Sequence, residues 1–221
     1  HYAFDAQMVS ADVKGRVNLA EALKLLDPKA PRTWEGTAEF KAGVRGRLAD
    51  PAWNLSISGK GLSSRSSKIS PGDMALQAHG SLSQATIQTL EWNSPQGKLR
   101  ASGEWKRGTG SHLQFHCEQV GLAPLASFTR VGFLGSLSVD LDGEADVPGN
   151  PWVPPQLDTL SVKAEGRFRR AEETVGRLSV DLAGGLLDIP DINLETPEIF
   201  AEGSGAFRLG KRSLLSISAK A

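Results

Sequence analysis

The sequence has little of several features that would point to a common class of protein. It contains one cysteine, Cys117, in 221 residues, so no disulfide can form within the chain. Lysine plus arginine and aspartate plus glutamate number 25 each, and the lack of a basic excess argues against a nucleic-acid-binding protein. No stretch approaches the roughly 18 consecutive apolar residues of a membrane-spanning helix.

Large aromatic side chains are also scarce, at 6% of residues, whereas glycine is abundant with 24 copies. Ordinary β-sheet cores are filled by large rings, so this combination is unusual. The sequence begins with His1 rather than methionine and has no signal peptide. We therefore expect it to be a piece of a longer protein, whose targeting information lies elsewhere.

What the sequence does have is strict alternation of apolar and polar residues. In Gly135–Ala145, Val139 and Leu141 share one parity, while Asp140 and Asp142 share the other. A period of two over this length predicts a strand with one apolar and one wet face. At about 3.4 Å per residue this strand would span more than roughly 30 Å, which is longer than usual.

The same alternation recurs along most of the chain and predicts an all-β fold. We expect a long, curled antiparallel sheet with two short helices, Val17–Leu26 and Val120–Ala126, where apolar residues adopt helical spacing. Asn18 is a candidate cap for the first helix. Leu62–Gly72 is expected to be a polar loop.

The pattern also repeats at long range. Pairs of similar residues recur 102 positions apart, as in 189 − 87 = 102: Ile87, Leu90 and Trp92 match Ile189, Ile192 and Leu194. This period predicts tandem copies of a unit with a short helix and about six strands. We assign residues 1–16 to the end of a preceding repeat, 17–119 to a first repeat and 120–221 to a second.

Small residues occupy the apolar parity unusually often, for example Gly59, Ala78, Gly103 and Gly166. Glycine in a strand often marks a bend or a close approach by another group. Rows of glycine and alanine would let a sheet curl tightly around an unfilled apolar trough about as wide as an acyl chain. The alternative is a thin sandwich with a filled core, in which glycine only permits twist and bulges. The pattern leaves both open.

The order of these motifs resembles the AsmA-like superfamily, and most closely its large TamB-type proteins. Val44–Gly61, Gly80–Trp105 and Val120–Gly143 carry the resemblance. It implies a taco-like or repeating β-groove with an apolar interior, a periplasmic location and an inner-membrane anchor outside this sequence. It also implies a role in carrying phospholipid to the outer membrane or in assembling outer-membrane proteins. The family has no catalytic residues to carry over, so we do not expect an enzyme.

On this hypothesis the partners are phospholipid acyl chains, with an outer-membrane β-barrel protein as a further candidate, and no cofactor is required. We expect a charge at Val139 to block lipid transfer without unfolding the protein. Other interpretations are a scaffold that binds barrel strands along a sheet edge, and a structural or adhesive β domain with a filled core. The residues predicted to line the groove are Leu55, Ile57, Leu76, Leu99, Leu113, Phe115, Val139, Leu141, Val162 and Leu194.

The remaining candidates for chemistry are weak. His112 and His116 share the wet parity of one strand, but four residues of strand separate them by about 13 Å, too far for one metal ion. We therefore predict no metal site. Cys117 lies on the apolar parity, where an inert buried thiol is the simpler interpretation than a nucleophile. The acidic residues Asp140, Asp142 and Glu144 share the wet parity and are expected to be solubilising.

Overall fold

The computed structural model describes residues 8–18, 21, 34–64, 72–123, 135–149, 159–197 and 200–208. The elements formed by these residues are β-strands, which confirms the predicted all-β, antiparallel architecture. No helix in these ranges has the length and apolar character needed to traverse a bilayer. The chain divides into two compact units, His1–Lys106 and Arg107–Ala221, which we call the N-terminal unit and the C-terminal unit.

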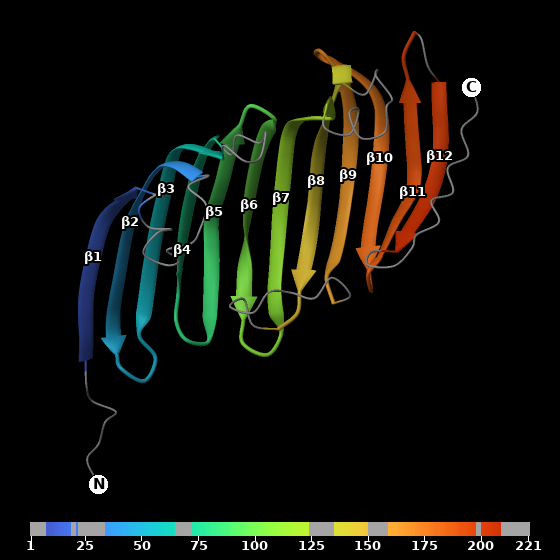
Figure 1. Cartoon of the computed structure of the whole chain (residues 1–221). Coiled ribbons are helices and arrows are strands. Elements are labelled where there is room, and N and C mark those ends of the chain that lie inside the picture. Colours follow the sequence, from blue (N-terminus) through green and yellow to red (C-terminus); the bar gives the residue numbers. More distant parts are fainter. Residues whose placement is uncertain are drawn as a thin grey trace. The chain divides into compact units, whose positions relative to one another are not determined.

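The N-terminal unit is an antiparallel sheet whose strands follow one another in chain order (Figure 1). Its cross-strand register keeps apolar residues opposite apolar residues: Phe40 faces Ile57, and Ile57 in turn faces Leu76. Alternation therefore places one apolar and one polar face on this sheet. The strands are β1 Met8–Asn18, β2 Trp34–Arg47, β3 Ala52–Ser64, β4 Gly72–Gly80, β5 Gln84–Ser94 and β6 Gly97–Lys106.

The C-terminal unit has the same plan, with six described strands that pair antiparallel in chain order. Val139 faces Phe168 and Leu178 faces Ile192, so apolar residues again share one face. The strands are β7 Gly110–Gly121, β8 Leu137–Val147, β9 Ser161–Arg170, β10 Glu173–Ala183, β11 Leu186–Glu195 and β12 Phe200–Arg208.

A β-bulge recurs at the same place in both units. The register shifts between Ile87 and Leu90 in β5, and again between Ile189 and Ile192 in β11. Each bulge inserts one extra residue, so two apolar residues three positions apart reach the same face. In β11 the inserted segment contains Pro190, which has no N–H to donate to a neighbouring strand. The bulges are 102 residues apart (189 − 87), the interval seen in the sequence.

The structure has β-strand at the positions where the two predicted helices were expected to begin. Val17 and Asn18, expected to start and cap the first helix, belong to β1, where they pair with Ala38 and Thr37. Val120, expected to start the second, belongs to β7 and faces Val139. The strand pairing continues through these positions because it satisfies their backbone groups directly. Most of the remaining helical segments lies outside the described residues.

The predicted polar loop also begins later than expected. Gly61, with a φ of 60°, lies at a bulge in β3 and turns Leu62 onto the apolar face. The Leu62 side chain packs over Gly59 and is only 8% exposed. The favourable free energy of burying the Leu62 side chain explains why β3 continues to Ser64.

We predict that Gly176→Ala destabilises the protein, because the added methyl group would overlap the main-chain carbonyl oxygen of Asn193 on β11. The main chain of a paired strand cannot move without breaking hydrogen bonds, so the substitution should lower the free energy of unfolding by about 1–3 kcal/mol. Urea unfolding followed by circular dichroism measures it, with Ser204→Ala on the exposed side of β12 as control. Equal midpoints for the two variants would contradict this packing.

Candidate functional site: the apolar face

Four residues predicted to line a groove lie on the apolar face of the N-terminal unit. Ile57 and Leu76 face each other across β3 and β4. Leu55 faces Ala78 at the next pair on the same face. Leu99 faces Trp92 across β5 and β6. Leu55, Ile57, Leu76 and Leu99 are all half-buried. The strands of this unit belong to one sheet, so these side chains keep part of their apolar surface accessible.

Two glycines of the apolar face are covered by aromatic rings from the neighbouring strand. A Cβ atom at Gly15 would lie 2.7 Å from the ring of Phe40, its direct cross-strand partner. A Cβ atom at Gly143 would lie 2.5 Å from the ring of Phe115, again its direct partner. At these positions glycine makes room for a ring lying flat on the sheet. The apolar trough, one of the two possibilities that the sequence left open, is therefore partly filled at these positions by the sheet's own side chains.

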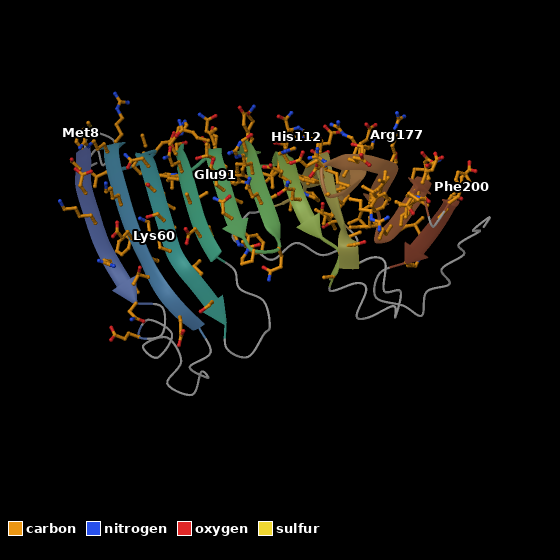
Figure 2. All side chains as sticks on the ribbon, turned by 90° about the horizontal axis from the view of Figure 1, so that it is seen from above. Met8, Lys60, Glu91, His112, Arg177 and Phe200 are labelled. Atoms are coloured by element: carbon orange, nitrogen blue, oxygen red, sulfur yellow. The ribbon has the colours of Figure 1, made fainter. Side chains whose placement is uncertain are left out.

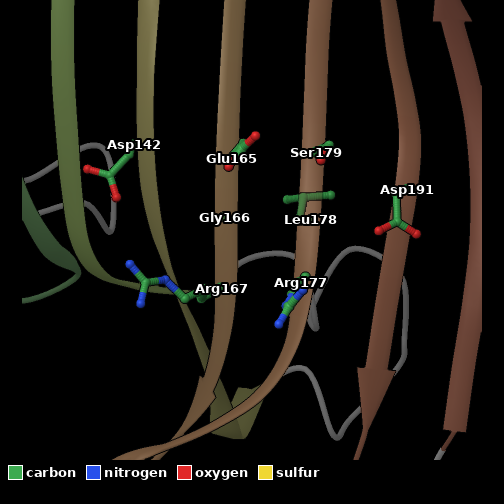
Figure 3. A pocket seen from close by; sticks show the side chains of 8 residues that line it. All are labelled: Asp142, Glu165, Gly166, Arg167, Arg177, Leu178, Ser179 and Asp191. Carbon is green, nitrogen blue, oxygen red and sulfur yellow. The ribbon is translucent and has the colours of Figure 1, made fainter.

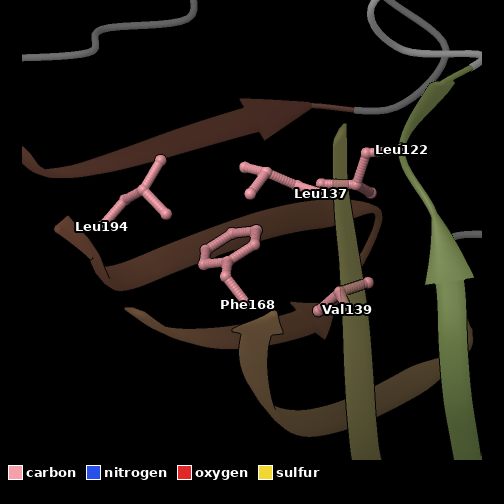
Figure 4. Packing of buried hydrophobic residues seen from close by; sticks show 5 residues of the cluster. All are labelled: Leu122, Leu137, Val139, Phe168 and Leu194. Carbon is pink, nitrogen blue, oxygen red and sulfur yellow. The ribbon is translucent and has the colours of Figure 1, made fainter. Parts of the chain in front are cut away.

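In the C-terminal unit part of the apolar face is a packed core. Val139 and Leu194, both predicted to line the groove, are 5% exposed and belong to a cluster with Leu122, Leu137 and Phe168 (Figure 4). The side chains of this cluster come from β8, β9, β11 and the end of β7. Val139 and Leu194 are thus core residues, inaccessible to a ligand in this arrangement.

The other four predicted residues of this unit remain partly accessible. Leu113, Phe115, Leu141 and Val162 are half-buried, and Leu141 packs against the edge of the cluster. Leu113 and Val162 both face Ala145, so they lie on either side of β8 at one level of the sheet. The ten predicted residues therefore share the apolar parity of their sheets but separate into eight half-buried positions and two core positions.

Sequence reasoning overlooked three residues of the packed cluster as members of a site. The sequence shows Leu137 and Phe168 as members of apolar rows. It does not show that Leu137 pairs directly with Arg170 or that Phe168 pairs directly with Val139. Leu122 follows the bulge in β7, where its N–H donates to the main-chain oxygen of Leu137 (3.0 Å). Bulge positions decide which residues converge, and alternation alone does not reveal them.

The polar face of the C-terminal unit carries hydrogen-bonded pairs of side chains. His116 Nδ1 lies 2.6 Å from Asp142 Oδ1, and His112 Nδ1 lies 2.8 Å from Asp146 Oδ1. Each pair joins direct cross-strand partners on β7 and β8. Asp140 accepts hydrogen bonds from the Gln119 N–H and from Arg169. In the part of the chain that is described, no group of three or more His, Cys, Asp or Glu side chains is placed to hold a metal ion.

Comparison of the chain with protein families, with curated proteins and with solved structures finds no match.

We predict that Val139→Asp destabilises the fold, in contrast to the expectation from sequence. The new carboxylate would be buried without a cationic partner in the cluster, which should cost about 3 kcal/mol. Val13→Asp is the matched control, because Val13 on β1 is 56% exposed, and it should cost less than about 1 kcal/mol. Urea denaturation compares the two. A stable Val139→Asp variant would show that the cluster is open to water.

We predict that Cys117 reacts slowly with iodoacetamide near neutral pH. Burial raises the pKa of the Cys117 thiol, and the negative charge of Asp142 raises it further, so little of the reactive thiolate is present. The rate should increase as the pH rises through this elevated pKa, and Asp142→Asn should increase it at fixed pH. Alkylation followed by mass spectrometry measures both rates. Equal rates for the folded and the urea-unfolded chain would contradict the proposed shielding.

Proposed function

We propose that this chain is a segment of a periplasmic AsmA/TamB-like protein that carries phospholipid between the inner and outer membranes along its apolar sheet face. The observation that carries the proposal is the half-exposed apolar face of the N-terminal unit. Phe40, Ile57, Leu76 and Leu90 form a continuous cross-strand row on four strands, all of them half-buried. Contiguous accessible apolar surface of this kind is typical of a binding surface.

The chemistry required is physical and not covalent. Each CH₂ group of an acyl chain that leaves water for such a surface gains about 0.8 kcal/mol. These contacts have no preferred direction, so a chain held along Leu55, Ile57 and Leu76 can slide without breaking specific bonds. The polar face of the same sheet is hydrated and carries ion pairs such as Arg45–Asp12 at 3.0 Å. Neither a cofactor nor a catalytic residue is needed for this role.

A strand-edge scaffold is the second candidate, and one observation favours it. Within the described part of the N-terminal unit, β1 pairs only with β2, so its other side forms an edge. Met8 and Val13 on this strand are 73% and 56% exposed. An exposed edge can add an extended segment of another protein through main-chain hydrogen bonds. The third interpretation, a structural β domain, is favoured by the packed cluster of the C-terminal unit.

The test is a matched pair of double variants. Ile57→Asp with Leu76→Asp places two charges on direct cross-strand partners of the apolar face. Ser56→Asp with Gln77→Asp places two charges on the adjacent direct partners of the polar face. The apolar pair should reduce co-purified phospholipid at least roughly tenfold, because each charge would have to be desolvated by an acyl chain. The polar pair should leave it unchanged.

Native mass spectrometry followed by solvent extraction and lipid analysis measures the bound phospholipid, and circular dichroism checks that both variants are folded. Equal retention in the two variants would contradict lipid binding on this face. A parent chain free of lipid that excludes apolar dyes would favour the structural domain. Saturable binding of peptides from outer-membrane barrel strands, without lipid, would favour the scaffold.

A further inference from the structure

The polar face of the C-terminal unit contains an open depression formed across four strands, β8 to β11 (Figure 3). Gly166 and Leu178 contribute to its lining, but its charged and hydroxyl residues have the opposite parity and belong to the polar face, so they do not depend on the function proposed for the apolar face. Its charged and hydroxyl side chains are Asp142, Glu165, Arg167, Arg177, Ser179 and Asp191.

The strand register sorts these charges by sign. Arg167 and Arg177 are direct cross-strand partners, and we call them the arginine pair. Two residues further along each strand, about 7 Å away, Glu165 faces both Asp142 and Ser179, and Ser179 faces Asp191. We call these four residues the acidic row. On its other side Arg167 faces Asp140 of β8, but that carboxylate is bonded to Arg169. Like charges directly opposite one another repel, so the register creates two adjacent regions in which like charges face each other.

The charges of the depression differ in whether they already have partners. Asp142 is occupied by His116, and the neighbouring Asp140 is occupied by Arg169 and by the Gln119 N–H. For Arg167, Arg177, Glu165 and Asp191, the described part of the chain supplies no ion pair. Arg167 and Arg177 are exposed, so their guanidinium groups remain available for a ligand.

We propose that this depression binds a zwitterionic phosphoester, with its phosphate on the arginine pair and its ammonium group on the acidic row. Guanidinium groups bind phosphate oxygens through two parallel hydrogen bonds, which suits two arginines side by side. A simple anion would lie within one Debye length, about 8–10 Å, of three carboxylates and would be repelled. A simple cation would likewise be repelled by the two arginines.

The spacing of the two regions narrows the class of ligand. In an α-amino acid the two charged groups are attached to one carbon atom, too close together to reach both rows. A phosphate and an ammonium joined by a short carbon linker, as in phosphoethanolamine, span more of the distance. Ser179, within the acidic row, adds a hydroxyl group that can accept from the ammonium. A soluble phosphoester such as phosphoethanolamine and the headgroup of phosphatidylethanolamine both carry this phosphate and this ammonium group.

The test uses the full chain and ³¹P NMR titration at fixed ionic strength. O-phosphoethanolamine should bind roughly tenfold more tightly than inorganic phosphate, because only the former engages both rows. Arg167→Gln with Arg177→Gln should weaken the binding of both ligands. Glu165→Gln with Asp191→Asn should weaken the binding of phosphoethanolamine, because its ammonium group loses its carboxylate partners. The same variant should strengthen the binding of inorganic phosphate, because the carboxylates no longer repel the anion. This crossed response distinguishes the site from a general effect on folding.

Arg45→Gln is the control, because Arg45 is an exposed arginine of the N-terminal unit that is already paired with Asp12. It should leave both affinities unchanged, and circular dichroism should show that all variants are folded. Vesicles of phosphatidylcholine with and without phosphatidylethanolamine then separate a membrane source from a soluble one. Equal affinities for phosphate and phosphoethanolamine, or no binding of either at millimolar concentration, would overturn the proposal. Neither outcome affects the lipid retention that tests the apolar face.

Discussion

The structure depends on the pairing of apolar residues with apolar residues across neighbouring strands. Each strand alternates, so a register error of one residue would move its apolar side chains to the wet face. Direct pairs such as Ile57–Leu76 and Val139–Phe168 show that the register avoids this error in both units. Bulges at Gly61, in β5 and in β11 restore the alternation where the residue spacing changes to three. The sheets are organised by this constraint more than by any single core.

A sheet with one apolar face must cover that face or use it. The two units do so to different degrees. In the C-terminal unit, Leu122, Leu137, Val139, Phe168 and Leu194 pack together, and the burial of these side chains stabilises the unit directly (Figure 4). In the N-terminal unit the apolar side chains are mostly half-buried, as at Phe40, Ile57 and Leu76, and among its described hydrophobic residues only Leu62 and Ala78 are buried. This difference makes the N-terminal unit the better candidate for holding an apolar ligand.

The polar faces of both units carry exposed charged side chains. Figure 2 shows the side chains that project from the ribbon, among them Glu91, His112 and Arg177. Some charges lie opposite a cross-strand neighbour of opposite sign, as in Glu91–Arg100 at 3.6 Å and Arg16–Glu39 at 3.9 Å. The arginine pair and the acidic row depart from that rule on one side: Arg167 faces Arg177 and Glu165 faces Asp142, whereas on its other side Arg167 faces Asp140, which is bonded to Arg169. Such a departure is the kind of local conflict that a ligand can resolve.

The sequence by itself determined the fold class, the faces of the strands and the recurrence at 102 residues, because alternation and its period are local properties of the chain. It did not determine the extent of the strands at Val17 and Val120, where pairing with a distant strand prevails over local helical spacing. Only the tertiary structure separated Val139 and Leu194, which are core residues, from half-buried Ile57 and Leu76, although all four share one pattern. Burial depends on which strands lie side by side and where bulges fall, and neither is encoded in the alternation of one strand.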